Sequence, residues 1–550
     1  MAVARSGRLD LVTTSILWAR LLAVVDEAAA TLIRTSFSMI VREVHDMTQL
    51  LTDDRGQTLA QSAVSTPGFV GTTAGGVRRF LELWPAETWR PGDVAITNDP
   101  WVVTGHLPDV TVVTPVFHPR RGGRLVAFMA NTAHMTDIGG TYFGVNTTEV
   151  FEEGLRIPPL KLVSAGRPVQ PVWDMIRANV RAPDQVVGDI RAQIAANQQG
   201  GPTISGIMAE YGLADLRGLA RAIHDASDRA LGDALAGVPD GTYLAEATGD
   251  GYGEPFTVKL ALTVKAGRLH FDFTGSSPQQ RTPINAVIQY TRAYAAFTTK
   301  CAFVPAIPNN EGLLRRITLE APRGSIVNAV EPAPVQSRHV LGFVLQGAVF
   351  AAFAQCAPAH CQADSGTPPP IITFYGTKPD GTPFLTFEFV NGGVGGKPTG
   401  DGRSTTTFPS NIANLPVEVL ESTAPVLYLE QRLIPDSGGA GLHRGGLGQR
   451  KSFRVEHPMM ASLIIDRFRH PPPGVLGGNP GRRAEARFAD GRPVAMKGVL
   501  ALQPGDVLTI ESPGGGGYGD PGKRPDDLIR RDYEEGYITQ WPGSNGGTTP

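Results

Sequence analysis

The sequence predicts a mixed α+β chain in which an N-terminal α/β unit precedes a helical middle segment and a β-rich C-terminal half. Two observations support this prediction. The chain contains 65 glycines and 45 prolines, and both residues favour turns over long helices. Apolar residues recur at helical spacing near the N-terminus and between residues 172 and 235, whereas strand-like runs dominate from residue 239 onward.

The N-terminal unit is expected to begin with an amphipathic helix, because apolar residues recur at helical spacing over residues 17–33. Two apolar runs on either side of Asp53-Asp54-Arg55-Gly56 predict a hairpin. A second helix is expected over residues 74–84. Two further strands are expected over residues 110–117 and 125–131, on either side of a turn.

The rest of the chain changes from helix to strand. Helices are expected within residues 172–235, and a helix over residues 343–356 interrupts the later strands. Glycine clusters such as PDSGGAGLHRGGLG and SPGGGGYGDP are expected to supply positive φ angles and close backbone approach, in β corners or in loops around a ligand. We therefore expect four segments: a metal-site unit over residues 1–160, a helical segment over 161–235, a β-rich region over 236–539 and a flexible tail over 540–550.

Charge and cysteine content argue against several classes of function. A formal net charge of -2 at pH 7 leaves no basic surface for nucleic acid. The apolar run near the N-terminus is interrupted by Arg20, Asp26 and Glu27 and lacks a signal-peptide cleavage site, so we expect neither export nor membrane insertion. Three cysteines are too few, and odd in number, for a disulfide framework, which favours a reducing, cytoplasmic compartment.

Histidines and aspartates gather in two short stretches that flank the predicted strand pair. The first stretch contains His106 and Asp109, and the second contains His134 and Asp137. If the strands pair as an antiparallel hairpin, both stretches reach the same end of it. Because Pro108 cannot continue a central ladder, His106 and Asp109 are expected on a loop just before the strand.

The register of this hairpin can also be predicted. Pairing Phe117 with Arg124 across the turn sets Asp109 opposite Thr132. This register brings the two imidazoles and the carboxylate to one end of the same ribbon.

Two imidazoles and a carboxylate that meet with room for solvent are typical of a divalent-metal site, and Zn, Mn and Fe are all compatible with these ligands. Such an ion would lower the pKa of a bound water and produce a hydroxide nucleophile. The alternative is that Asp109 caps its own turn and that His106 and His134 bond to backbone carbonyls.

The stretch NDPWVVTGHLPDVTVVTPVF resembles the NDP…GTHLPDV…PVF signature of the hydantoinase B/oxoprolinase family, and NTAHMTDIGG resembles the segment that follows it. Further segments of the chain resemble the family in the same order, among them EVFEEGLRIPPLKL, NVRAPDQVVGDIRAQIAAN, FDFTGSSPQQRTPIN, NLPVEVLE and DRFRHPPPGVLGGNPG. The resemblance therefore extends over most of the chain.

The resemblance implies a division of labour between two subunits. A hydantoinase A-type partner binds ATP-Mg and phosphorylates the carbonyl oxygen of a cyclic amide, and this subunit directs the attack of metal-bound water, in an α2β2 or larger complex. The positions that match the family's ligands are His106, Asp109 and His134. Asp46, in REVHD, matches an acidic position of the family and is a further candidate, as a ligand or as a contact of the ligands.

Three functions stay open at this point. The first is hydrolysis of a hydantoin, a lactam or a 5-oxoproline-like ring, and the modest length of the chain favours it. The second is carboxylation of a ketone of the acetone or acetophenone type. The third is a non-catalytic scaffold for an ATPase partner, which would not need a His/Asp/His set.

Two departures from the family pattern concern the substrate rather than the ligands. Met135 stands where the family often has a second histidine, and Val102-Val103 replace smaller residues.

Other motifs are weaker. Residues 392–399, GGVGGKPT, lack the first glycine and the hydroxyl residue of a phosphate-binding loop, so the chain shows no nucleotide site of its own. Cys356, His360 and Cys361 lack partners at zinc-finger spacing. Arg338 and Arg444 could meet an anionic intermediate, but arginines that cap carbonyls are the default, so neither is counted in the site.

Overall fold

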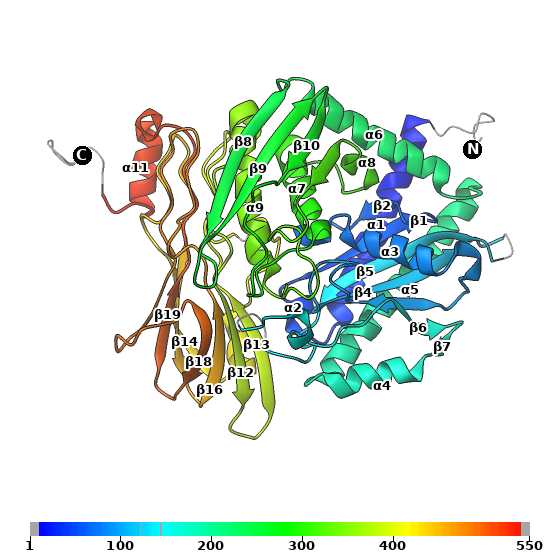
Figure 1. The fold of residues 1–550 in the computed structure, drawn as a ribbon, viewed down its shortest axis with the longest axis horizontal. Helices are drawn as coiled ribbons and strands as arrows, with labels where there is room; N and C mark the ends of the chain where they lie inside the picture. Colours follow the sequence, from blue (N-terminus) through cyan, green and yellow to red (C-terminus); the bar gives the residue numbers. More distant parts are fainter. Residues whose placement is uncertain (1–9, 121–122, 143–145, 407, 541–550) are drawn as a thin grey trace.

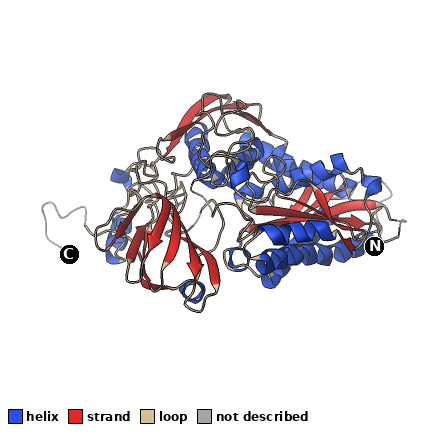
Figure 2. Ribbon diagram, turned by 60° about the horizontal axis from the view of Figure 1, so that its bottom comes forward, coloured by secondary structure: helices blue, strands red, loops and turns tan. Residues whose placement is uncertain are grey.

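The structure, a computed structural model, describes residues 10–120, 123–142, 146–406 and 408–540. It confirms the mixed α+β class. The tail predicted over residues 540–550 lies outside the described residues except for its first position. Figures 1 and 2 show a helix-covered sheet at the N-terminal side, a smaller sheet beside it and a pair of sheets at the C-terminal side.

The N-terminal sheet has seven strands in the order β2-β1-β5-β4-β3-β6-β7. Neighbouring strands are antiparallel throughout. The predicted hairpin around Asp53–Gly56 is confirmed as β1 and β2. The strand bounds are β1 Met47–Asp53, β2 Thr58–Gln61, β3 Val94–Thr97, β4 Asp109–Phe117, β5 Leu125–His134, β6 Leu160–Ser164 and β7 Arg167–Pro168.

The two faces of this sheet are covered by different helices (Figure 1). Side chains alternate along β5, so that Ala127 and Met129 pack towards α1 and α5, while Phe128 and Ala130 pack towards α3. The helix predicted over residues 74–84 is confirmed as α3. The helix bounds are α1 Leu11–Thr35, α2 Met39–Arg42, α3 Thr72–Leu83, α4 Gln170–Asn179, α5 Pro183–Tyr211 and α6 Arg217–Leu235.

Amide side chains join α5 to the sheet below it. Asn131 Nδ2 donates to Gln49 Oε1 (3.0 Å) and to the Gln193 carbonyl oxygen (2.9 Å). Gln193 Nε2 and Asn197 Nδ2 donate to carbonyl oxygens of β4, at 2.8 and 3.1 Å. Because all four amides are buried and bonded, α5 is fixed against the strand that begins at Asp109.

The predicted register of β4 and β5 is wrong by two residues. Asp109 pairs with His134, and not with Thr132. The turn is one residue longer than predicted, with Phe117 opposite Leu125, and an irregularity between Val116 and Phe117 adds a second residue. Asp109 is also the first residue of β4 rather than part of the preceding loop. The corrected register sets the carboxylate directly opposite the imidazole.

The middle of the chain adds a four-stranded sheet in the order β11-β10-β9-β8, and two long helices pack beside it. The helix predicted over residues 343–356 is confirmed as α9, whereas α7 was not predicted. The bounds are β8 Gly241–Gly249, β9 Phe256–Lys265, β10 Arg268–Asp272, α7 Ile288–Phe303, α8 Glu311–Leu314, β11 Ile317–Glu320 and α9 Arg338–Cys356. Among the described residues, α9 is the one helix long and apolar enough to cross a membrane, and 78% of that stretch is buried inside the structure.

The C-terminal region contains two more four-stranded sheets, in the orders β13-β12-β16-β18 and β14-β15-β19-β17. Their strands are β12 Ile371–Thr377, β13 Pro383–Phe389, β14 Val426–Leu433, β15 Gln449–Val455, β16 Met459–Ile464, β17 Glu485–Phe488, β18 Lys497–Leu502 and β19 Val507–Glu511, with helices α10 Val417–Thr423 and α11 Asp526–Glu534.

Glycine-rich segments between these strands pack backbone against backbone. Gly396 N donates to the Gly516 carbonyl oxygen (2.8 Å), and Gly515 N donates to that of Gly446 (2.9 Å). A Cβ atom on Gly515 would overlap the carbonyl group of Val394. The structure uses both roles predicted for these clusters: φ is not positive at these four glycines, where the backbones approach closely, but it is positive at Gly519, in the same SPGGGGYGDP cluster.

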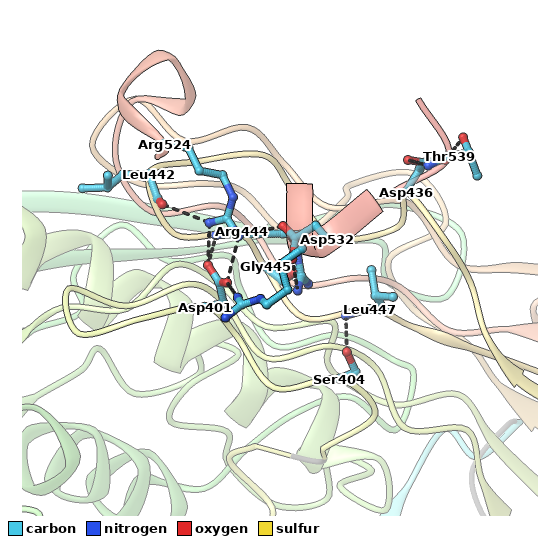
Figure 3. A network of polar contacts seen from close by, with 11 residues as sticks. Asp401, Ser404, Asp436, Leu442, Arg444, Gly445, Leu447, Arg524, Asp532 and Thr539 are labelled. Atoms are coloured by element: carbon cyan, nitrogen blue, oxygen red, sulfur yellow. Dashed lines mark hydrogen bonds and ion pairs between the residues drawn. The ribbon is translucent and has the colours of Figure 1, made fainter. Parts of the chain in front are cut away.

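Charged side chains attach α11 to this glycine-rich region (Figure 3). Arg444 Nε lies 3.1 Å from Asp532 Oδ2, and Arg524 bonds both Asp532 (2.6 Å) and Asp401 (2.7 and 2.9 Å). The charge of Arg444 is therefore paired with Asp532 in this network.

Candidate metal centre

Three residues converge at one end of the β4–β5 pair, where β4 begins and β5 ends. His106 Nε2 lies 2.8 Å from Asp109 Oδ1, and His134 Nδ1 lies 3.2 Å from the same oxygen. The potential ligand atoms of His106, Asp109 and His134 all lie within 4.8 Å of one another, and all three residues are buried. The structure thus brings together the three residues singled out in the sequence.

His106 is held in one tautomer. Its Nδ1 lies 3.0 Å from the Gln336 carbonyl oxygen, which can only accept, so Nδ1 carries the hydrogen and Nε2 the lone pair in the neutral ring. Burial lowers the pKa of His106 to about 4, and the charge of Arg338 acts in the same direction. The ring is therefore neutral at pH 7 and turns a lone pair towards a carboxylate.

The donor set fits a cation. A lone pair and a carboxylate oxygen at 2.8 Å repel each other unless a proton or a positive ion lies between them. Because the low pKa of His106 disfavours the proton at neutral pH, a metal ion is the better match to this arrangement. Two neutral imidazoles and one carboxylate are ligands that Zn, Mn and Fe accept.

Arg338 was not predicted to belong to this group. It is the first residue of α9, and its Nη2 forms an ion pair with Asp109 Oδ2 while its Nε donates to the Thr104 carbonyl oxygen (2.6 Å). Burial alone would raise the pKa of Asp109, but the neighbouring His106 and the charge of Arg338 outweigh burial and hold it well below the usual value. Arg338 thus caps a carbonyl, as expected by default, and also keeps Asp109 ionised.

Asp46 lies at the margin of the triad. Its Oδ2 is 3.7 Å from His134 Nδ1, and its carbonyl oxygen accepts a hydrogen bond from His134 N (3.1 Å). Burial raises the pKa of Asp46 to about 6. The position is compatible with either role predicted for Asp46.

Asp137, the further candidate in the sequence, is turned elsewhere. Its carboxylate bonds Arg181 Nη1 (2.7 Å) and Gly139 N (3.2 Å).

The Cys356, His360 and Cys361 group forms no metal cluster among the described residues, and its cysteines are free. His224 is buried away from the triad, and its Nε2 lies 2.8 Å from the Thr58 carbonyl oxygen.

A cavity of about 660 Å³, counted with the open space at its mouth, has the triad in its wall. Aromatic rings make much of the remaining surface, and they come from widely separated segments: Phe69, Tyr290, Tyr294, Phe343, Phe387 and Phe389. No local sequence pattern indicates these rings, because they meet only through the tertiary fold.

Comparison with known proteins agrees with this picture. The model of the family described as hydantoinase B/oxoprolinase matches residues 10–521. The 5-oxoprolinase 1 of Arabidopsis thaliana is 30% identical over 93% of this chain and 42% of that protein. The caprolactamase subunit beta of Pseudomonas jessenii is 29% identical over 96% of this chain and 94% of that subunit.

Two solved structures share the fold. The crystal structure of the ATP-dependent caprolactamase from Pseudomonas jessenii has a TM-score of 0.87 at 28% identity and covers 96% of this chain and 94% of that chain. A nucleotide-free acetone carboxylase has a TM-score of 0.85 at 18% identity and covers 96% of this chain and 78% of that chain. At this lower identity the likeness concerns the fold alone.

Proposed function

The chain belongs to the hydantoinase B/oxoprolinase family, and on this premise we propose that it is the metal-dependent catalytic subunit of an ATP-dependent hydrolase of cyclic amides. The observation that carries the proposal is the convergence of His106, Asp109 and His134 in the wall of an aromatic cavity. A separate hydantoinase A-type subunit phosphorylates the amide carbonyl oxygen, and this chain directs water to the carbonyl carbon.

The triad has a defined task in this reaction. His106, Asp109 and His134 would hold a divalent ion, which would polarise carbonyl oxygens and make water nucleophilic near neutral pH. The Gln336 carbonyl fixes the ring of His106, and Arg338 keeps Asp109 in its anionic, ligating form. Asp46 acts as a further ligand or as a hydrogen-bonding contact of the site.

The reaction balances with ATP and two waters. One water adds its oxygen to the carbonyl carbon and supplies a proton to the nitrogen as the ring C–N bond breaks, and a second water releases the phosphoryl group, so that ATP becomes ADP and phosphate. Because the phosphorylated intermediate would also react with bulk water, a cavity walled by aromatic rings is suited to it.

The proposal requires a partner for the ATP-dependent step. Residues 392–399 form no phosphate-binding loop in sequence, and Gly393, Gly395 and Gly396 pack against backbone in the structure. A relative is itself named as subunit beta of a caprolactamase. We therefore propose a complex with an ATP-binding subunit, as α2β2 or larger, in the cytoplasm, where ATP is available and three free thiols remain reduced.

Ketone carboxylation is the second candidate considered, and the shared fold of acetone carboxylase does not distinguish it from hydrolysis. A scaffold without catalytic function would have no need of a buried His/Asp/His group next to a cavity. Hydrolysis is preferred because the caprolactamase is a relative at both the sequence and the structural level.

Reconstitution with the ATP-binding subunit tests the proposal. Caprolactam and substituted hydantoins are supplied with ATP, a divalent metal, ¹⁸O-water and labelled bicarbonate. We expect a ring-opened product that carries oxygen from water, with ADP and phosphate formed in equal amounts. Label from bicarbonate in the product would show that the reaction is carboxylation and not hydrolysis. Sustained turnover by this chain alone would show that no partner subunit is needed.

A further inference from the structure

We propose that the cavity accepts an uncharged ring with an apolar substituent and rejects rings that carry a carboxylate, such as 5-oxoproline. This inference rests on the proposed function and specifies its substrate class. It follows from the chemistry of the residues that line the cavity together with the triad.

Most of the other lining residues are apolar, although Thr66 and Ser410 each add a hydroxyl group. Besides the six aromatic rings, the lining contains Ile40, Ile371 and Ile412 with Pro67 and Pro369. Tyr290 and Tyr294 use their hydroxyls on each other, at 3.3 Å. A hydrocarbon substituent placed here leaves water for carbon surroundings, which is favourable in proportion to the area covered.

Cationic groups able to receive a carboxylate are scarce. Arg338 is the one lysine or arginine among the described residues that line the cavity. Its Nη2 bonds Asp109, its Nε bonds the Thr104 carbonyl, and its face lies 4.1 Å from the centre of the Tyr290 ring. Burial lowers the pKa of His339 well below its usual range, so this imidazole is neutral and offers no positive charge to a carboxylate.

A bound ring brings its substituent into contact with the rest of the lining. The reacting carbonyl must face His106, Asp109 and His134, so a substituent on the ring meets the aromatic and aliphatic side chains of the cavity. A carboxylate there would lose its water without gaining a partner.

The cavity offers a position where this preference can be reversed. Ile412 is half-buried and also lines a neighbouring surface hollow, so a longer side chain at this position has room for its charged end. Ile412→Arg would therefore supply the missing cation, and Ile412→Met is the matched uncharged control.

Calorimetric binding to the full-length, metal-supplied protein tests the inference with three nearly isosteric hydantoins. Their substituents at carbon 5 are isobutyl, carbamoylmethyl and carboxymethyl, so that shape is kept while polarity and charge change. We expect the isobutyl compound to bind at least about tenfold more tightly than the carboxymethyl compound, with the carbamoylmethyl compound between them. Equal affinities, a reversed order or no measurable binding of any of the three would overturn the inference.

The Ile412 variants separate charge from shape. Ile412→Arg is expected to shift the ratio of the two affinities by at least about tenfold towards the carboxymethyl compound, while Ile412→Met leaves it unchanged. The same compounds are given to the complex with ATP. Ring opening of the carboxymethyl compound alone would keep the proposed function and refute the substrate class. If the binding preference is found but no compound is ring-opened, the substrate class stands and the proposed function is refuted.

Discussion

Asp109 is the residue on which the candidate centre depends, because both imidazoles approach the same carboxylate oxygen while Arg338 bonds the other. Sequence spacing placed His106, Asp109 and His134, with Asp137, at one end of a hairpin, and the family resemblance narrowed this group to the first three. Sequence spacing could not select Arg338, which is 229 residues distant from Asp109 and reaches it only through the packing of α9.

Arg338→Gln tests whether the guanidinium prepares Asp109 for a metal. The variant leaves a buried carboxylate without its cationic partner, so the free energy of unfolding should fall by about 3–5 kcal/mol. Metal affinity should fall by about 10–100-fold, as for other contacts that orient a ligand. Equilibrium metal titration and denaturant unfolding measure the two effects.

Arg444→Gln is the matched control for this substitution. Arg444 is also buried and paired, with Asp532, but it does not line the cavity. The Arg444→Gln variant should therefore lose stability but keep the metal affinity of the wild type. Equal metal affinity in wild type and Arg338→Gln would show that Arg338 serves the fold alone.

At the scale of elements, Glu153 fixes the segment that leads into α9. Its Oε1 accepts hydrogen bonds from Val335 N (2.8 Å), Gln336 N (2.9 Å) and Thr147 Oγ1 (3.1 Å). Gln336 in turn holds His106 through its carbonyl oxygen. Burial raises the pKa of Glu153 to about 8 from an ordinary value of 4.5.

The raised pKa of Glu153 predicts a pH dependence of stability. A raised folded-state pKa means that the contribution of Glu153 is fully present below pH 4.5 and is lost as pH rises to about 8. Glu153→Gln cannot titrate, so its stability relative to wild type should rise over this window, by at most about 1.4 kcal/mol per pH unit. Urea unfolding of both proteins between pH 5 and 9 measures the difference. A constant difference, or one that falls with pH, would contradict the assignment.

The glycine-rich segments give a second prediction at this scale. In Gly515→Ala the added methyl group overlaps backbone atoms that cannot move aside, so stability should fall by about 3 kcal/mol or more. Gly206→Ala is the control, because this glycine lies within α5 with open space around it and should gain about 0.5–1 kcal/mol. Thermal unfolding compares the two variants, and a tolerated alanine at position 515 would refute the packing argument.

The long amphipathic helices and the alternating strands were predictable, because their periodicity is local. The helix α1 and the hairpin of β1 and β2 are confirmed nearly as expected. The β4–β5 register was not predictable, because a turn one residue longer and an irregularity near Phe117 shift every pair beyond them. Helix α7 was missed because most of it is buried on several sides and shows no clear apolar stripe.

At the scale of the whole molecule, the cavity draws on widely separated parts of the chain. His134 comes from the first sheet and His106 from the loop that precedes β4, Tyr290 and Arg338 come from the paired helices α7 and α9, and Phe387 comes from β13. Such a cavity cannot be read from any one segment. The segment boundaries at residues 160, 235 and 539 stay a prediction, as does the ATP-binding partner.

The metal content of the full-length protein tests the central claim most directly. Wild type, the double variant His106→Ala/His134→Ala and the control His270→Ala/His443→Ala, whose histidines lie outside the cavity, are purified alike, and their folding is compared by circular dichroism. Elemental analysis should find about one divalent ion per chain in wild type and control, and almost none in the double variant. Full metal content in a folded double variant would show that His106 and His134 are not the ligands.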